Sequence, residues 1–203
     1  YTVVEQNFTL QRLQPRLGNR HAVFFAHLRE VLSNHYERNP VDPRTSHALT
    51  LEVDSFGNVL KSLTVAYGRR TPSTDPALTD EDKAKQSQLL ITYTESSYTQ
   101  NEIPLAVLAA GHHRAPIPAE TRTYELTGFT PEKGARFSFV EWSRDNFALL
   151  ASAGEIPYEL EADVTKKQKR LIEDVRTLYR KDDLSALSPL GKKAVNASTA
   201  RTR

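Results

Sequence analysis

The chain has 203 residues, of which 38% are hydrophobic and 26% are charged, and 27 basic residues nearly balance 25 acidic ones. This length accommodates one large or two small domains, and the net charge of +2, with basic residues concentrated only towards the C-terminus, argues against a nucleic-acid-binding surface. The absence of cysteine excludes disulfides, zinc ribbons and thiol catalysis, and the absence of methionine, even at position 1, predicts a piece of a longer protein.

The N-terminal part contains two apolar segments separated by a turn. Residues 1–20 begin with a strand-like run and end on a Pro-Arg-Leu-Gly turn. The next segment, at 21–38, is ambiguous, because Phe24 and Leu28 fit both a helical stripe and one face of a strand. The sequence NPVDP at 39–43 ends this element in either case.

Residues 49–67 have the pattern of a β-hairpin. Apolar residues alternate with polar ones on both sides of an SFGN turn, which indicates strands with one buried face. Gly57 supplies the positive φ that such a turn needs, and Asp54 and Asn58 have the side chains typical of turns. Asp54 is therefore interpreted as a turn former rather than as a catalytic base.

A polar segment follows at 71–86, and it predicts an exposed loop. Its carboxylates, Asp80, Glu81 and Asp82, lie next to lysines, as on a solvated surface. A glycosidase needs paired acids held across a cleft, and neither this cluster nor the one at 182–183 suggests that spacing.

Two further strands are predicted at 88–99 and 121–129, the second ended by Gly128. The stretch between them, 101–120, is rich in proline and reads as a connection with one helical turn at 105–110.

The C-terminal part contains the strongest helix candidate, near residues 138–152. Val140, Phe147 and Leu150 fall along one side of this helix, and Gly154 stands where a C-cap would lie. The last patterned segment, at 166–184, fits a helix or a strand. Its basic residues are interpreted as one charged face.

Tyrosines followed by polar or basic residues recur along the chain, the first four spaced about thirty residues apart. One interpretation is the ordinary preference of tyrosine for strand ends. The other is a quasi-regular curved sheet in which each hairpin adds the same unit. These tyrosines are Tyr36, Tyr67, Tyr93, Tyr124 and Tyr179.

Motifs that carry chemistry are missing: the sequence has no nucleophile elbow, no phosphate-binding loop and no zincin helix. His112 and His113 form the one adjacent histidine pair, but neighbouring residues on a strand point in different directions and make a poor metal site. Trp142, beside Glu141 and Arg144, fits the core of an amphipathic helix better than a ligand pocket. The sequence therefore predicts no catalytic, cofactor-binding or metal-binding residue.

Ordered motifs from about residue 8 to residue 191 resemble the middle/C-terminal region of the B component of bacterial insecticidal toxin complexes, the Tc toxins. The most specific motifs are HYERNPVDPR at 35–44 and EVDSFGNVLKS at 52–62, and QKRLIEDVRTLYRKDDL at 168–184 follows in the same order.

The resemblance implies a mainly β fold, in which antiparallel hairpins form a segment of a curved, Rhs-like β-sheet shell with one short helix. It favours strands for both ambiguous segments. It also implies one β-rich fragment over residues 1–190. Residues 191–203 depart from the family's pattern and are interpreted as a divergent or non-native tail. No catalytic residue is implied, because the self-cleaving aspartates of this family belong to the C component.

The function implied by the resemblance is non-enzymatic: the shell encapsulates a toxic C-terminal cargo before its delivery to the host cell. The implied partners are the C component, the remaining shell of the B component and, indirectly through an upstream propeller, the A component, with no nucleic acid and no direct membrane insertion. The complex would be assembled in the bacterial cytoplasm and secreted.

Two alternatives remain open from the sequence. One is a free-standing β-sandwich binding or adhesion module that uses loops such as 71–87 and 100–119. The other is an enzyme of the glycosidase or ADP-ribosyl type. Either of these would fold alone, whereas a shell segment would expose unpaired sheet edges.

Overall fold

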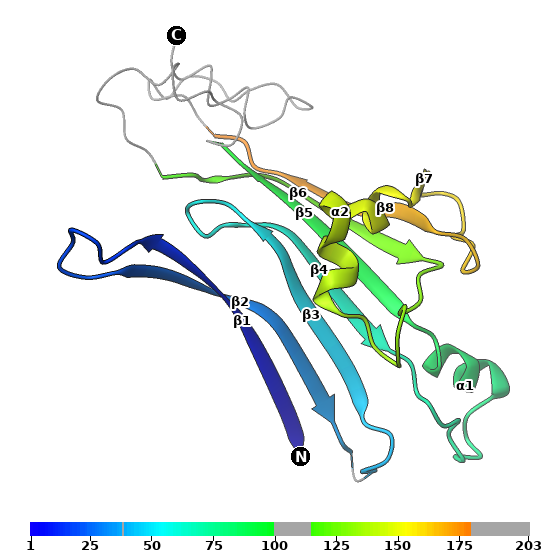
Figure 1. Cartoon of the computed structure of the whole chain (residues 1–203). Coiled ribbons are helices and arrows are strands. Elements are labelled where there is room, and N and C mark those ends of the chain that lie inside the picture. The colour runs from blue at the N-terminus through cyan, green and yellow to red at the C-terminus, as the bar shows by residue number, and fades with distance from the viewer. Residues whose placement is uncertain (38, 100–114, 180–203) are drawn as a thin grey trace.

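The structure is a computed structural model that describes residues 1–37, 39–99 and 115–179. Within these residues, eight strands form one sheet in the order β1-β2-β3-β4-β5-β6-β8-β7, and two helices accompany it (Figure 1). The strands are β1 Thr2–Gln14, β2 Val23–His35, β3 Arg44–Val53, β4 Val59–Tyr67, β5 Leu90–Tyr98, β6 Pro118–Thr127, β7 Gly154–Ile156 and β8 Gln168–Arg176. The helices are α1 Asp80–Gln86 and α2 Phe139–Ala151. The mainly β fold is confirmed.

Neighbouring strands are antiparallel except for β7 and β8, which run parallel. From β1 to β6 each strand pairs with the next one in the sequence, so this part of the sheet is a meander of hairpins. No helix in the described part of the chain is long and apolar enough to cross a membrane. The tail at 191–203 lies outside the described residues.

Both ambiguous segments are strands. β2 pairs with β1 along its whole length, from Thr2 opposite His35 to Gln14 opposite Val23. β8 pairs with β6 from Gln168 to Arg176. Pairing with other strands thus decides between helix and strand for these two segments, a choice that the local pattern left open.

The contact between β2 and β3 is shorter than that between β2 and β1, because β3 pairs only with Glu30–His35 of β2. A register shift between Asn7 and Phe8 of β1 falls at the same level. Beyond it, residues 23–28 of β2 pair with β1 and not with β3, and in Figure 1 the β1–β2 hairpin diverges from the rest of the sheet there.

The β3–β4 hairpin has the predicted turn. Gly57 adopts φ +86°. Asp54 Oδ1 accepts hydrogen bonds from the backbone N–H groups of Phe56 at 2.9 Å and Asn58 at 2.8 Å, which confirms its role as a turn former. A Cβ on Gly57 would lie 3.0 Å from the Phe25 ring of β2, so the turn contacts the diverging hairpin directly.

The segment 71–86, expected to be a loop, contains the helix α1 in its second half, so the expectation was wrong for residues 80–86. The hydroxyl of Thr79 accepts from the N–H of Asp82 at 3.1 Å, and the Asp82 carboxylate accepts from the N–H of Thr79 at 3.0 Å, which is a capping box. The acidic residues predicted to be mere surface charges therefore stabilise the first turn of a helix.

The helix predicted near 138–152 is present as α2, but its details differ from the prediction. Ser138 is the N-cap and Ser152 the C-cap, whereas Gly154 begins β7. Val140 is 62% exposed instead of facing the core. Residues 145–147 have positive φ angles, so α2 is two helical segments joined at a kink.

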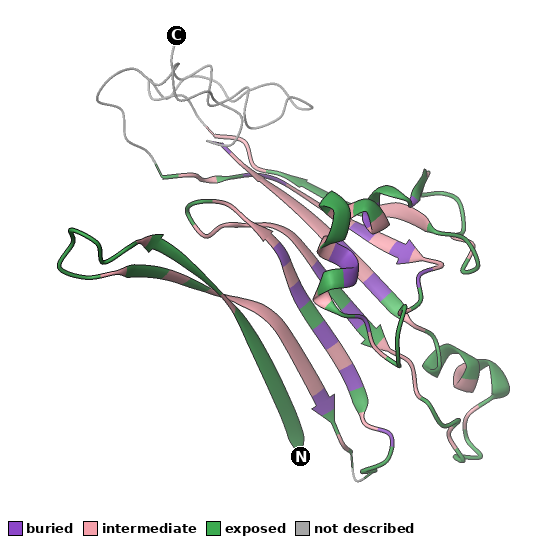
Figure 2. Cartoon of the chain, viewed as in Figure 1, coloured by how far each residue is buried: buried purple, intermediate pink, exposed green. Residues whose placement is uncertain are grey.

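The hydrophobic core lies between α2 with its preceding segment and one face of β3 to β6. Figure 2 shows buried residues on these strands and on α2, and mostly exposed ones on β1. Leu49, Leu63 and Val65 are almost fully buried, and Trp142 of α2 is completely so. The placement of Trp142 in the core is confirmed.

The recurring tyrosines occupy different positions in the sheet. Tyr93 and Tyr124 lie opposite each other on β5 and β6, with ring centroids 6.1 Å apart. Tyr67 lies opposite Thr45 at the end of β4 and not in that row, and Tyr36 stacks on Tyr1 beyond the end of β2.

Candidate functional site

Residues weighed from the sequence as chemical candidates take structural roles wherever the structure describes them. Glu141 caps α2 together with Ser138, and Arg144 pairs with Glu132 instead of facing the ring of Trp142. His112 and His113 and the acids at 182–183 lie outside the described residues. The histidine that does enter a polar network is His47, which the sequence reasoning did not single out.

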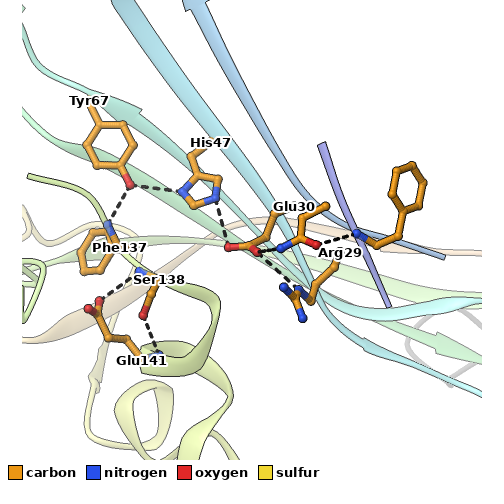
Figure 3. Close-up of polar contacts among 9 residues, drawn as sticks. Arg29, Glu30, His47, Tyr67, Phe137, Ser138 and Glu141 are labelled. Carbon is orange, nitrogen blue, oxygen red and sulfur yellow. Dashed lines mark hydrogen bonds and ion pairs between the residues drawn. The ribbon is translucent and has the colours of Figure 1, made fainter. Parts of the chain in front are cut away.

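Three neighbouring strands and the segment before α2 each contribute one group to a partly buried polar network (Figure 3). His47 Nε2 of β3 lies 3.6 Å from Glu30 Oε1 of β2. His47 Nδ1 lies 3.3 Å from the hydroxyl of Tyr67 on β4. The same hydroxyl accepts a hydrogen bond from the backbone N–H of Phe137 at 3.0 Å. We call Glu30, His47, Tyr67 and Phe137 the His47 cluster.

Neighbouring contacts hold the same segment on the sheet. Arg136 Nη2 donates to Asn34 Oδ1 at 3.3 Å, and the guanidinium of Arg29 lies 5.1 Å from the centre of the Phe139 ring. The ring of Phe137 packs against Trp142 with centroids 4.9 Å apart. The His47 cluster thus lies where the start of α2 is attached to β2, β3 and β4.

The electrostatics of the cluster favour a neutral histidine. His47 is only 5% exposed, and this burial lowers its pKa below the usual 6.5, an effect that Glu30 opposes and Arg136 reinforces. Burial also raises the pKa of the Tyr67 hydroxyl. A sequence signal for His47 existed: it shares the inward face of β3 with Leu49 and Leu51, by period-two alternation.

A row of alternating charges crosses the sheet on five adjacent strands. The register places Glu52 opposite Lys61, Lys61 opposite Glu95, Glu95 opposite Arg122, and Arg122 opposite Asp174. Lys61 Nζ contacts Glu52 Oε2 at 2.5 Å. Opposite charges on facing residues stabilise strand pairing, so this row is a structural feature of β3, β4, β5, β6 and β8.

A groove of about 580 Å³ opens where β5 and β6 meet the chain that follows β6. Its walls are mainly apolar and include Leu90, Phe129 and Val164. Its charged residues, Arg170 and Glu125, bind each other at 2.7 Å. The groove therefore does not bring together the groups that acid–base or nucleophilic catalysis needs.

The two borders of the sheet are its most open parts. β1 ends the sheet on one side and carries apolar side chains that are more than half exposed: Phe8 at 52%, Leu10 at 71% and Leu13 at 58%. On the other side β7 covers only three residues of β8, and Ile172 and Val175 of β8 are 42% and 50% exposed. A free strand edge presents backbone donors and acceptors that a further strand can pair with.

Comparisons with known proteins agree with this architecture. The family described as the insecticide toxin TcdB middle/C-terminal region matches residues 1–108. The chain is similar to the crystal structure of TcdB2-TccC3, with 26% identity and a TM-score of 0.61 over 97% of this chain and 9% of that one. It is also similar to the crystal structure of TcdB2-TccC3-TEV, with 27% identity and a TM-score of 0.59 over 89% of this chain and 8% of that one.

The chain thus spans only 9% and 8% of the lengths of these two structures. Comparison with curated proteins gives no match.

Proposed function

Because the chain belongs to the family of the middle/C-terminal region of the insecticide toxin TcdB, we propose that it is a non-enzymatic structural segment of the hollow shell of an insecticidal toxin complex. In this role it helps to enclose the toxic C-terminal cargo before delivery to the host cell. Residues 1–190 act as one shell segment, and the complex is assembled in the bacterial cytoplasm and secreted.

The observation that carries the proposal is β1, a 13-residue strand that ends the sheet and exposes apolar side chains. Soluble proteins protect such edges with charges, prolines or covering segments. An exposed, apolar edge suits a strand that continues into a larger sheet. The one-sheet architecture does not favour the alternative of a free-standing β-sandwich, which needs two packed sheets.

The proposed partners follow from the same assignment to a toxin-complex shell. The similar structures pair TcdB2 with TccC3, which supports a C component as the partner of the protein that contains this segment. The remaining B component extends the sheet, and the A component is reached through the upstream propeller. The non-enzymatic role is supported by the polar side chains of the described residues, whose contacts cap helices, form turns and attach α2.

The proposal is tested by size-exclusion chromatography with light scattering on the 203-residue chain, together with its far-UV circular dichroism. We expect a β-rich species heavier than the 22.9 kDa monomer, because the free edges pair with one another. The double variant Phe8→Lys with Leu10→Lys, which places two charges on β1, is expected to increase the fraction of monomer. A cooperatively melting wild-type monomer would contradict the proposal.

The matched control is Leu17→Lys, which replaces an even more exposed leucine in the turn between β1 and β2. It leaves the association unchanged if the β1 edge drives it. Equal effects of both variants would show that surface hydrophobicity alone, and not strand pairing, causes the association.

A further inference from the structure

The His47 cluster links a titratable side chain to the attachment of α2. Two hydrogen bonds lead from the start of α2 through Tyr67 to His47, and a longer contact of 3.6 Å continues to the acid on β2. The N–H of Phe137 donates to the Tyr67 oxygen, which leaves the Tyr67 O–H to donate to His47 Nδ1. His47 Nε2–H then faces the carboxylate of Glu30. This arrangement assigns His47 as the neutral Nε2–H tautomer.

A second proton on His47 conflicts with this arrangement. It would lie on Nδ1 and face the hydrogen of the Tyr67 hydroxyl, which would have to turn away and lose its acceptor in a partly buried site. A hydroxyl that is largely removed from water and has no acceptor lowers the stability of the fold. The hydroxyl that turns is the one that accepts the Phe137 N–H, so the disturbance reaches the start of α2 directly.

The charged groups around His47 come from every element packed against it. Glu30 of β2 and Arg136 of the segment before α2 act on the charge of His47, whereas Glu141 of α2 acts on Tyr67 of β4 and Arg29 of β2 pairs with Glu30. Glu30 is already in contact with Arg29 at 3.3 Å and with Asn7 at 3.1 Å. Its charge is thus shared among partners and only partly available to an imidazolium.

We infer that the His47 cluster is an acid-sensitive attachment: protonation of His47 breaks the Tyr67–Phe137 contact and loosens the start of α2 from the sheet. This inference is independent of the proposed shell function, since it concerns contacts within the chain. The consequence at acidic pH is exposure of the core face that α2 covers on β3 to β6.

The direction of the pH dependence follows from linkage. Burial lowers the pKa of His47 in the folded chain below the 6.5 of the free side chain. Its contribution is therefore complete above about pH 6.5 and is lost as the pH falls through the lowered value. Over that range the fraction of molecules with α2 detached rises by up to about tenfold for each pH unit.

The test uses Trp142, which is the one tryptophan of the chain and is fully buried in α2. Its fluorescence is measured from pH 7.5 to 4.5, with far-UV circular dichroism as a check that the sheet persists. We expect a red shift with a midpoint below pH 6.5 in the wild type, and an emission in His47→Gln that no longer changes over this range. A wild-type emission that stays constant, or a His47→Gln titration equal to that of the wild type, would overturn the inference.

The matched control is His35→Gln, which removes an exposed histidine of β2 that contacts Thr2. We expect the Trp142 emission of this variant to change with pH as it does in the wild type. If His47→Gln fails to fold, the wild type still decides the matter by NMR, through the His47 ring resonance and the amide exchange of Phe137. A His47 midpoint at or above 6.5, or Phe137 exchange that does not follow it, would refute the inference.

Discussion

Gly57 shows how one residue connects two parts of this sheet. It lies in the β3–β4 turn at φ +86°, and an added Cβ would come within 3.0 Å of the Phe25 ring on β2. A side chain at this position is therefore opposed by two effects, the backbone conformation and the neighbouring ring. The turn is a point of contact between hairpins as well as a reversal of the chain.

We expect Gly57→Ala to lower the thermal stability of the chain, at a cost of about 2 kcal/mol from positive φ and the forced shift of Phe25. The measurement is the melting midpoint by circular dichroism. Gly18→Ala is the control, because Gly18 also has positive φ, at +74°, but nothing within 4 Å of its Cβ position. That change costs about 1 kcal/mol. Equal shifts for the two variants would mean that Phe25 plays no part.

At the scale of elements, the sheet combines an apolar row with a charged one. Leu63, Tyr93, Tyr124 and Leu171 lie in register across β4, β5, β6 and β8, on the face that α2 partly covers. The charged row from Glu52 to Asp174 crosses the same strands further along. Each row opposes a slip of the strands, because a shift by one residue would exchange the two faces.

Lys61→Glu tests the charged row. The variant places a carboxylate opposite both Glu52 and Glu95, and facing like charges destabilise a strand pair by about 0.2–1 kcal/mol each. It also removes the ammonium that lies 4.2 Å from the ring of Phe147 on α2. We expect a lower melting midpoint that added salt partly restores, because salt screens the repulsion between carboxylates.

The control for this variant is Lys85→Glu on α1, where the exposed lysine pairs with the exposed Glu81 of the preceding turn. Its effect is smaller, since surface pairs contribute little. A loss in Lys61→Glu that does not respond to salt would assign the effect to the lost ring contact instead of to the charges.

The alternating pattern of single elements was readable in the sequence, and their distant contacts were not. The β3–β4 hairpin follows from its alternation and its turn residues. β2 and β8 needed the resemblance, since their patterns fitted two structures and only pairing with β1 and β6 decides between them. α1 was missed although Thr79 and Asp82 have the spacing of a capping box, because the surrounding prolines and charges suggested a loop.

The same limit applies to the candidate site. His47, Tyr67 and Phe137 come together through cross-strand neighbours and the return of the chain over the sheet, and their sequence separations carry no sign of it. The apolar alternation around His47 marked its inward direction but not its partners. The kink in α2 did have a sign in the sequence, since Asp145 and Asn146 are poor helix formers that tolerate positive φ, but the apolar stripe of the helix outweighed it.

At the scale of the whole molecule, burial is uneven. The core lies under α2 on β3 to β6, whereas β1 is exposed along nearly all of its length. Local opening follows local burial. We expect hydrogen exchange to be slowest at amides of β4 and β5 and fastest, among the long strands, in β1.

The measurement is residue-level hydrogen exchange on the chain under the conditions in which it is least associated. Phe8→Lys with Leu10→Lys serves as the reference, because it reduces pairing between chains through β1. Protection of β1 equal to that of β4 in this variant would show that the edge has a stable partner within the chain itself.

The short contact between β2 and β3 has a mechanical consequence. Pairing of β2 with β3 stops at Glu30, and the register shift of β1 lies beside it, so one level of the sheet separates two stiff plates. Residues 8–14 with 23–28 form one plate, and the sheet from β3 onward forms the other, with Phe25 in contact with Gly57 between them. We expect the sheet to bend most readily at this level, because a change in the angle between the plates there leaves the backbone pairing within each plate intact. If the proposed shell contains such segments, we expect its wall to bend at these levels.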